Sequence, residues 1–395
     1  MSRIKVAIML VSPAKAGVES VVLNIFKFFK SDKIELFLIC SAEIAPYYAE
    51  FVAPEKLLIL GKFFNKPSNK YVQWATRFWK RKFKTDEKKL NRWAQKSLKF
   101  INMHNIVCMH ANLVWDYYIA STIKNLRPDL KYFNTMHGTL ALDPSDDYFP
   151  FFHRPVILKM LSNADVFISA CKYFINLLQI RQVPLRKTIL IPNGIDQEWM
   201  HNYSPNIENK IVKLCFMGGG RPHQKGGDIL IYALKLLIDR HNISNFKLLI
   251  FGNVPLHSKE RELANDLNLN ANIEWHGFIE PPMHLKGMEE SDIFVLPSRH
   301  EGVANTLMEA IGMSMPIVAT NVGGTTEVIM NDINGLLCFP DAHDLAEKLA
   351  ILIANSNLRA KFSLANQTIR NQYIWPTVCK LYESAYLNLN NSASK

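Results

Sequence analysis

Residues 213–241 have the sequence KLCFMGGGRPHQKGGDILIYALKLLIDRH, and this stretch decides the fold. A short apolar run at 213–217 leads into three glycines, then a polar turn, then an amphipathic stretch at 227–241. A continuous apolar run predicts a strand covered on both faces, and the amphipathic stretch predicts a helix. The pattern is strand, glycine-rich turn, helix, which is the repeating unit of a parallel sheet.

The same alternation extends outward through the chain and predicts parallel sheets with right-handed crossovers. A helix is also predicted at 345–355, and the last helix at 375–389. Strands are predicted at 5–11, 36–40, 106–110, 132–136, 166–170, 188–191, 213–217, 247–251, 273–276, 293–297 and 317–319.

A chain of 395 residues rarely folds around a single core, so two domains are expected. The alternation falls into two blocks that meet at the turn-rich segment 191–196. We predict an α/β fold of two Rossmann-like, doubly wound parallel-sheet domains facing a central cleft. The first covers 1–190, with a C-terminal helix at 375–395 packing back on it, and the second covers 191–374.

The composition is that of an ordinary globular protein, with 48% hydrophobic and 21% charged residues. No apolar run reaches the roughly 18 residues that a membrane-spanning helix needs. The start resembles a signal peptide in its Arg3 and Lys5, but its apolar run at 6–11 is short, so a buried strand is favoured. The six scattered cysteines are predicted to be small, reduced core residues.

The net charge of +11 is concentrated in residues 62–99, which carry thirteen basic and two acidic residues, a net of 13 − 2 = +11. Eight aromatic residues lie among them. A basic amphipathic helix with tryptophans suits an anionic membrane surface. The alternative is a solvated basic face whose aromatics pack on the N-terminal sheet. A nucleic-acid groove is not expected, because no binding motif accompanies the charge.

The first candidate binding loop is the glycine turn at 218–220 with Arg221 and Lys225. Glycines let a backbone approach a ligand closely, and two cations at the mouth of a sheet suit a diphosphate. The loop lacks the Gly-Lys-Ser/Thr of a P-loop and the G-x-G-x-x-G of dinucleotide folds. A glycine-rich turn with solvated cations is the alternative.

The second loop is PSRHEGVANTLMEA at 297–310, which follows a buried strand and precedes a helix starting near 305. Glu301 in the loop and Glu309 in the first helical turn could bind sugar hydroxyls from two directions. Amides at the helix start favour an anion. The alternative for Glu309 is a helix cap, because Thr306 and Glu309 have capping-box spacing.

A third loop, TNVGGTTE at 320–327, also follows a strand and opens a helix. Because the carboxyl ends of parallel strands share one edge of the sheet, all three loops should meet there. Three such loops at one edge are hard to explain as coincidence.

Together these motifs resemble the retaining glycosyltransferases of family 4, which have the GT-B fold, of the bacterial surface-polysaccharide or lipopolysaccharide type. The shared features are the glycine-rich loop with Arg and Lys, a Glu-x7-Glu element, and a Gly-Gly loop with a downstream Glu. The resemblance spans roughly residues 4–385 and is weak between about 60 and 130.

The resemblance implies a role for each matching residue of the second domain, the donor domain. Arg221 and Lys225, beside Gly219 and Gly220, contact the donor diphosphate. Glu309 binds the ribose, and Glu301 faces the transferred sugar, as nucleophile or as hydroxyl ligand. The nucleobase lies near Phe278. The backbone of the loop supports sugar and phosphate at Gly302, Val303 and Ala304, with Asn305 beside them.

In the first domain, which binds the acceptor, the segment 16–19 (AGVE) resembles the family loop that closes on the donor phosphate. It keeps only Gly17, so the geometry at Ala16 departs from the pattern. His137, before Gly138, resembles the histidine that hydrogen-bonds the sugar; the alternative is an ordinary buried histidine. Val254 stands where the family has a further glycine.

The implied function is metal-independent transfer of a sugar from a nucleotide-sugar donor, with a UDP-sugar preferred over a GDP-sugar, to a glycan or lipid-linked acceptor. No cofactor is expected beyond the donor. A cytoplasmic protein, peripheral on the inner face of the membrane, is expected. The alternatives are a sugar-nucleotide epimerase or phosphorylase, and a non-catalytic nucleotide-sugar-binding protein on the same scaffold.

Overall fold

The computed structural model describes residues 3–12, 17–63, 75–138, 154–182, 188–203, 211–218, 222–279 and 283–388. The chain forms two compact units, Met1–Pro192 with Pro376–Lys395, and Asn193–Trp375. They divide within the segment 191–196, where proline, asparagine and glycine interrupt the alternation of strands and helices.

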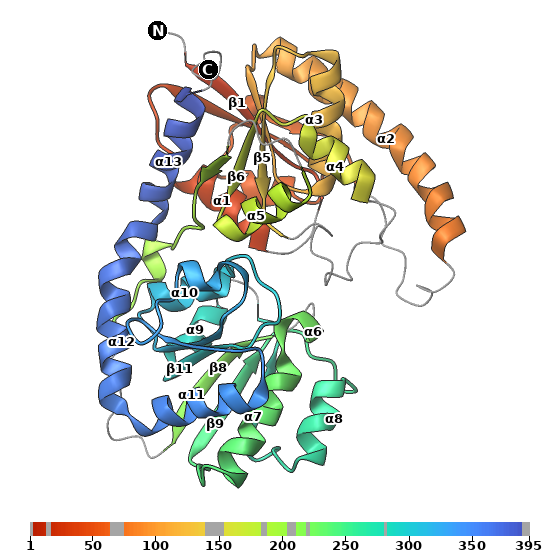
Figure 1. The fold of residues 1–395 in the computed structure, drawn as a ribbon. Helices are drawn as coiled ribbons and strands as arrows, with labels where there is room; N and C mark the ends of the chain where they lie inside the picture. The colour runs from red at the N-terminus through yellow and green to blue at the C-terminus, as the bar shows by residue number, and fades with distance from the viewer. Residues whose placement is uncertain are drawn as a thin grey trace. The chain divides into compact units, whose positions relative to one another are not determined.

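The first unit holds a parallel sheet whose described strands run in the order β3-β2-β1-β4-β5-β6-β7 (Figure 1). The order reverses between β1 and β4, as in a doubly wound sheet. The strands are β1 (Ile4–Leu10), β2 (Ile34–Cys40), β3 (Leu57–Ile59), β4 (Cys108–Ala111), β5 (Lys131–Met136), β6 (Val166–Ser169) and β7 (Thr188–Leu190). The α-helices are α1 (Gly17–Phe28), α2 (Ala75–Met103), α3 (Val114–Leu126), α4 (Arg154–Ser162), α5 (Lys172–Ile180) and, from the C-terminus, α13 (Trp375–Leu387).

The second unit repeats this plan with described strands in the order β10-β9-β8-β11-β12-β13, reversing between β8 and β11. The strands are β8 (Val212–Met217), β9 (Phe246–Phe251), β10 (Ile273–Gly277), β11 (Ile293–Leu296), β12 (Ile317–Thr320) and β13 (Leu336–Cys338). The α-helices are α6 (Pro222–Lys225), α7 (Gly227–Asp239), α8 (Lys259–Asp266), α9 (His284–Glu289), α10 (Asn305–Gly312), α11 (Ala342–Ala354) and α12 (Ser356–Ile369).

The predicted fold class, two doubly wound parallel-sheet domains, is confirmed. Each predicted strand is present, although the one predicted at 106–110 begins later, at Cys108. The short edge strands β3 and β13 were not predicted. All six cysteines are buried as thiols outside any disulfide, as expected for core residues. Among the described residues, no helix is both long and apolar enough to cross a membrane.

Apolar side chains fill both faces of the central strands, which explains their continuous apolar runs. In β1, the five residues from Val6 to Leu10 are fully buried. In the second unit, α7 and α11 lie against the sheet, and Leu214, Leu234 and Leu349 share one core cluster. The rigid sheets therefore fix the positions of the loops that follow their strands.

Helix α13 joins the first unit through polar contacts as well as apolar ones. The Tyr386 hydroxyl lies 2.6 Å from His110 Nδ1, and the Ser31 hydroxyl donates to Glu383 at 2.5 Å. His110 is fully buried. Burial lowers the pKa of His110 to about 3, so its ring is neutral.

Candidate donor site in the second unit

The loops after β8 and β11 lie side by side, because these strands are neighbours at the point where the strand order reverses. In doubly wound sheets, ligands bind at this switch point, beyond the carboxyl ends of the strands. The glycine-rich loop follows β8, and the loop with Glu301 follows β11. Two of the three sequence motifs therefore meet at this switch point.

Lys225 and Glu301 form an ion pair across these two loops. Lys225 Nζ lies 2.6 Å from Glu301 Oε1, and the Ser298 hydroxyl donates to the same oxygen at 2.9 Å. The Glu301 side chain is only 8% exposed, whereas that of Lys225 is 24% exposed. A buried carboxylate needs such partners, and they fix the direction in which Glu301 points.

Further contacts clamp the same two loops together. The Arg299 guanidinium forms a two-pronged ion pair with Asp228, at 2.7 and 2.6 Å. The Arg299 amide donates to the Gln224 carbonyl at 2.8 Å, and the Gln224 side chain donates to the His300 carbonyl at 3.0 Å. Sequence reasoning did not single out Arg299 or Asp228. These contacts tie the segment that carries Lys225 to the loop that carries Glu301.

The third loop connects to the second through a buried hydroxyl. Thr320 Oγ1 donates to the Ser298 carbonyl at 2.5 Å, and Thr320 is fully buried. Beyond it, Gly323–Glu327 forms a 3-10 helix. The strand end that carries Ser298 is therefore fixed from β12 as well.

The segment from Gly302 to Asn305 lies at the start of α10 and is partly enclosed. Val303 and Ala304 are 9% and 7% exposed. The Asn193 side chain donates to Asn305 Oδ1 at 2.7 Å and to the Val303 carbonyl at 3.3 Å. The sequence analysis did not identify Asn193 as a site residue. Its position in the turn-rich segment 191–196 is the sequence feature that could have indicated it.

Glu309 contacts His284, a residue that the sequence analysis did not identify. Its Oε2 lies 3.0 Å from His284 Nε2 on α9. The interpretation of Glu309 as half of a capping box is wrong, because the N-cap is Ala304 and no side chain caps the helix. Thr306 Oγ1 is buried without a hydrogen-bond partner in the described part of the chain.

The carboxyl ends of β9 and β10 carry a stacked aromatic pair. The rings of Phe251 and His276 lie 4.7 Å apart at an angle of 17°. Gly287 makes room for Phe251, because a Cβ there would lie 2.2 Å from its ring.

Phe278, the predicted neighbour of the nucleobase, is 57% exposed. Val254 packs against the core, which explains a side chain where the family pattern has glycine.

The first unit holds the two other predicted residues at the carboxyl edge of its sheet. Gly17 begins α1 after β1, and His137 follows β5. His137 is half-buried, and its Nε2 lies 3.1 Å from Asn112 Oδ1. Burial lowers the pKa of His137 to about 4. Gly219, Gly220 and Arg221 lie outside the described residues, as does Ala16.

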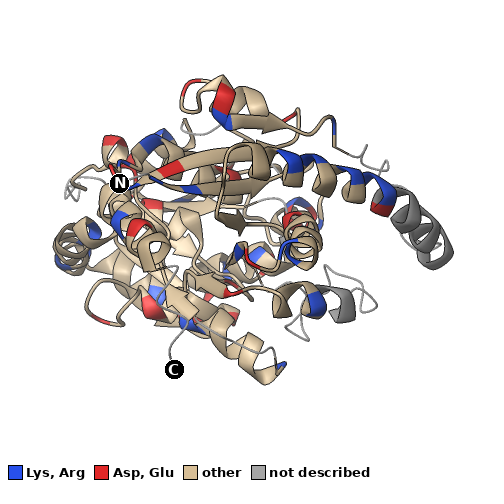
Figure 2. Cartoon of the chain, turned by 90° about the horizontal axis from the view of Figure 1, so that it is seen from above, with Lys and Arg blue, Asp and Glu red and all other residues tan. Residues whose placement is uncertain are grey.

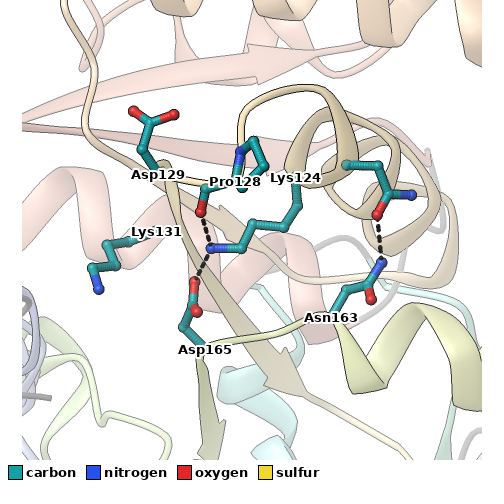
Figure 3. A pocket seen from close by; sticks show the side chains of 7 residues that line it. Lys124, Pro128, Asp129, Lys131, Asn163 and Asp165 are labelled. Atoms are coloured by element: carbon teal, nitrogen blue, oxygen red, sulfur yellow. Dashed lines mark hydrogen bonds and ion pairs between the residues drawn. The ribbon is translucent and has the colours of Figure 1, made fainter. Parts of the chain in front are cut away.

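A cavity of about 470 Å³ lies elsewhere in the first unit (Figure 3). Lys124 points into it but is satisfied by Asp165 at 2.7 Å and by two carbonyl oxygens. The cavity borders the amino ends of β5 and β6, away from the strand ends where the motifs gather. The motifs and the Lys225–Glu301 contact, and not this cavity, mark the candidate site.

This arrangement is that of a GT-B glycosyltransferase fold. The solved structure of Anabaena Alr3699/HepE in complex with UDP and glucose superposes with a TM-score of 0.76 over 98% of this chain and 100% of that one, at 16% identity. An identity this low shows the fold alone.

Sequence comparison identifies the second unit more closely. Residues 202–368 match the family model described as Glycosyl transferases group 1. An uncharacterized glycosyltransferase of Methanocaldococcus jannaschii is 33% identical over 56% of this chain and 60% of its own length. The capsular polysaccharide biosynthesis glycosyltransferase CapM of Staphylococcus aureus is 27% identical over 49% of this chain and 53% of its own.

These matches support a transferase enzyme of the glycosyltransferase class. The family model covers less than half of the chain. The chain spans about half to three fifths of the length of these two curated relatives. The family match therefore lies within the second unit, and the donor, the acceptor and the activity of the whole chain are argued from the site.

Proposed function

We propose that this protein is a retaining glycosyltransferase that moves a sugar from a nucleotide-sugar donor, preferably a UDP-sugar, to a glycan or lipid-linked acceptor of a bacterial surface polysaccharide. The observation that carries the proposal is the Lys225–Glu301 pair at the switch point between β8 and β11. It brings a cation suited to a diphosphate beside a carboxylate suited to sugar hydroxyls.

Transfer breaks the bond between the anomeric carbon and the diphosphate, and negative charge develops on the leaving phosphate. Lys225, with Arg221, is proposed to stabilise that charge. Fixed charges aimed at a developing charge contribute about 3–4 kcal/mol per group in enzymes. Because side chains supply this charge, transfer is proposed to need no metal and to persist in EDTA.

Glu309 is proposed to bind the ribose hydroxyls and Glu301 the transferred sugar. Glu309 is 31% exposed, so its carboxylate is accessible even though it also contacts His284. Glu301 is almost fully buried and held by two partners. Lys225 and Ser298 both hold Oε1, which gives the carboxylate a fixed orientation suited to binding sugar hydroxyls.

The donor preference has support from two sides. The segment from Glu301 to Asn305 resembles that of bacterial enzymes that use UDP-sugars, and the structurally similar HepE is known in complex with UDP and glucose. The acceptor class is proposed from the resemblance and from the similarity to CapM, which is named for capsular polysaccharide biosynthesis.

The test is a panel of UDP- and GDP-sugars incubated with the purified protein, with and without EDTA. We expect UDP-sugars to raise the melting temperature and UDP to be released in both conditions. Conversion of the donor to an epimer without nucleotide release would indicate an epimerase. Binding without turnover, even with glycan and lipid-linked acceptors present, would indicate a non-catalytic binder. Either result contradicts the proposal.

We also propose that the basic segment 62–99 docks on an anionic membrane. On the described part of α2, Lys88, Arg92 and Lys96 are exposed and lie four residues apart, a spacing that places them on one face of a helix. Figure 2 shows Lys and Arg residues recurring along the described part of this long helix. Trp93 is buried, whereas an aromatic side chain that faces a membrane is expected to be exposed. It is 3% exposed and packs beside Phe63, as the alternative of inward-packed aromatics predicts.

Co-sedimentation with vesicles containing anionic lipid tests this docking. Each basic residue near such a surface contributes about 1 kcal/mol. The triple variant K88Q/R92Q/K96Q should therefore bind more than tenfold more weakly. The control R240Q/K259Q/K361Q removes the same charge from exposed positions of the second unit. Absence of vesicle binding by the wild type at low salt would remove the proposal.

A further inference from the structure

Asn112 and His137 meet at the carboxyl edge of the first unit's sheet. Asn112 follows β4 and His137 follows β5, and these two strands pair in parallel. Asn112 is 1% exposed, and its Oδ1 lies 3.1 Å from His137 Nε2. A buried amide in contact with the candidate sugar-binding histidine is a feature that the motifs do not explain.

The orientation of the Asn112 amide is fixed by its other contact. Asn112 Nδ2 donates to the Met9 carbonyl at 3.2 Å. A carbonyl oxygen only accepts hydrogen bonds, so the atom that faces Met9 must be the NH2 group. The opposite atom, Oδ1, therefore faces His137. Because Oδ1 also only accepts, the hydrogen in this contact belongs to His137 Nε2.

The Asn112 backbone is held as firmly as its side chain. Asp116 is fully buried and accepts from the amides of Val11 at 2.8 Å, Leu113 at 2.8 Å and Asn112 at 3.3 Å. This carboxylate thus fixes the loop after β4 and the end of the loop after β1. Asn112 has little freedom to turn its oxygen away from the histidine.

Neutral His137 with its proton on Nε2 carries a lone pair on Nδ1. Burial lowers the pKa of His137, so the neutral ring dominates at physiological pH. Within the described part of the chain, Nε2 is the ring nitrogen that carries a hydrogen bond. The other nitrogen is left to accept a hydrogen bond from a substrate.

We propose that Asn112 is a positioning residue that locks His137 in the Nε2–H tautomer, so that Nδ1 accepts a hydrogen bond from a sugar hydroxyl. The inference rests on the proposed function, since it assumes that His137 meets the sugar. The substrate group that contacts His137 Nδ1 is then a hydroxyl that donates a hydrogen bond. A carboxylate or phosphate oxygen there would face the lone pair of Nδ1 and be disfavoured.

The tautomer can be read directly by long-range 1H–15N NMR of the imidazole rings, with His137 assigned from the spectrum of H137Q. The wild type should show a protonated Nε2 and an unprotonated Nδ1 near pH 7. In N112L, which removes the acceptor, the ring should populate both tautomers. N112D keeps an acceptor oxygen and should keep Nε2 protonated. The control N163A removes an asparagine that bonds Ser121 elsewhere in the unit.

The hydroxyl is tested with donor analogues that each lack one sugar hydroxyl. For one analogue, the wild-type kcat/KM should be at least tenfold lower than for the complete donor. This ratio between the two donors should be close to one in H137A and smaller than the wild-type ratio in N112L. A protonated Nδ1 in the wild type, or equal penalties in wild type and H137A, would overturn the inference. If no sugar nucleotide is turned over, the proposed function fails, and the NMR result still decides the tautomer.

Discussion

The backbone of Gly226 packs directly against the carbonyl of Pro297, at the end of β11. A Cβ at position 226 would lie 1.9 Å from the Pro297 oxygen, and Gly226 has a φ of 67°. The close contact requires glycine, and the positive φ favours it. This contact lies between Lys225 and the loop that carries Glu301, so the spacing of the candidate site depends on a residue without a side chain.

Replacing Gly226 by alanine should therefore destabilise the second unit. The left-handed backbone alone costs about 1–2 kcal/mol for alanine, and the clash with a backbone atom adds to it. Gly277 is the matched control, because its φ is 73° but no atom of the described residues lies within 4 Å of its Cβ position. In urea denaturation, G226A should lose clearly more stability than G277A. Equal losses would show that the Pro297 contact does not constrain the loop.

The Lys225–Glu301 pair should contribute to stability as well as to chemistry. Removal of Lys225 leaves the nearly buried Glu301 carboxylate with the Ser298 hydroxyl as its remaining donor among the described residues. We expect K225A to lower the free energy of unfolding by about 1–3 kcal/mol. The double variant K225A/E301Q should regain part of this loss, since the buried charge is gone.

The control for this pair is a solvent-exposed ion pair on α7. Lys235 lies 2.9 Å from Asp239, with 34% and 49% of the two side chains exposed. Such pairs contribute less than about 1 kcal/mol. If K235A and K225A change stability equally, burial of Glu301 has no energetic consequence.

His284 should affect donor binding through Glu309. Its Nε2 bonds the carboxylate proposed to hold the ribose, while Nδ1 is buried without a partner among the described residues. We expect H284L to raise the KM for the donor about tenfold, or ~1.4 kcal/mol, with a smaller change in kcat, because ribose contacts are uniform between ground and transition state. H241A, at an exposed histidine, is the control. An unchanged donor KM in H284L would contradict the proposed binding of the ribose by Glu309.

His110 should make the first unit sensitive to acid. Because the folded protein lowers the pKa of His110 from 6.5 to about 3, the unfolded chain binds the extra proton first. Stability therefore rises with pH between about 3 and 6.5 and is lost as pH falls through that window, at up to about 1.4 kcal/mol per unit. H110Q should show a shallower loss between pH 6.5 and 4.5 in urea denaturation. An unchanged slope would mean that the neutral ring does not govern acid stability.

Much of this structure followed from local sequence pattern. Continuous apolar runs predicted the central strands because burial on both faces leaves no room for polar residues. The edge strands β3 and β13 were not predicted, since three residues carry little periodicity, although β7 is equally short and was predicted. Lys225 and Glu301 were predicted from their places after strands.

Their partners could not be predicted in the same way. Arg299, His284 and Asn112 act through contacts between segments far apart in the chain, and no local spacing marks those contacts. The capping-box spacing of Thr306 and Glu309 misled because the N-cap is Ala304, two residues before Thr306. Spacing indicates which side chains share a turn, but the contacts of the fold decide which of them meet.

The most direct test of the central claim compares wild type and K225A in the release of nucleotide from a UDP-sugar. A lysine at the diphosphate should stabilise mainly the transition state, where negative charge develops on the leaving phosphate. We therefore expect the kcat/KM of K225A to be well over tenfold lower than that of the wild type, a loss of more than ~1.4 kcal/mol. K235A should match the wild type. A K225A rate within tenfold of the wild type would contradict the assignment of this site.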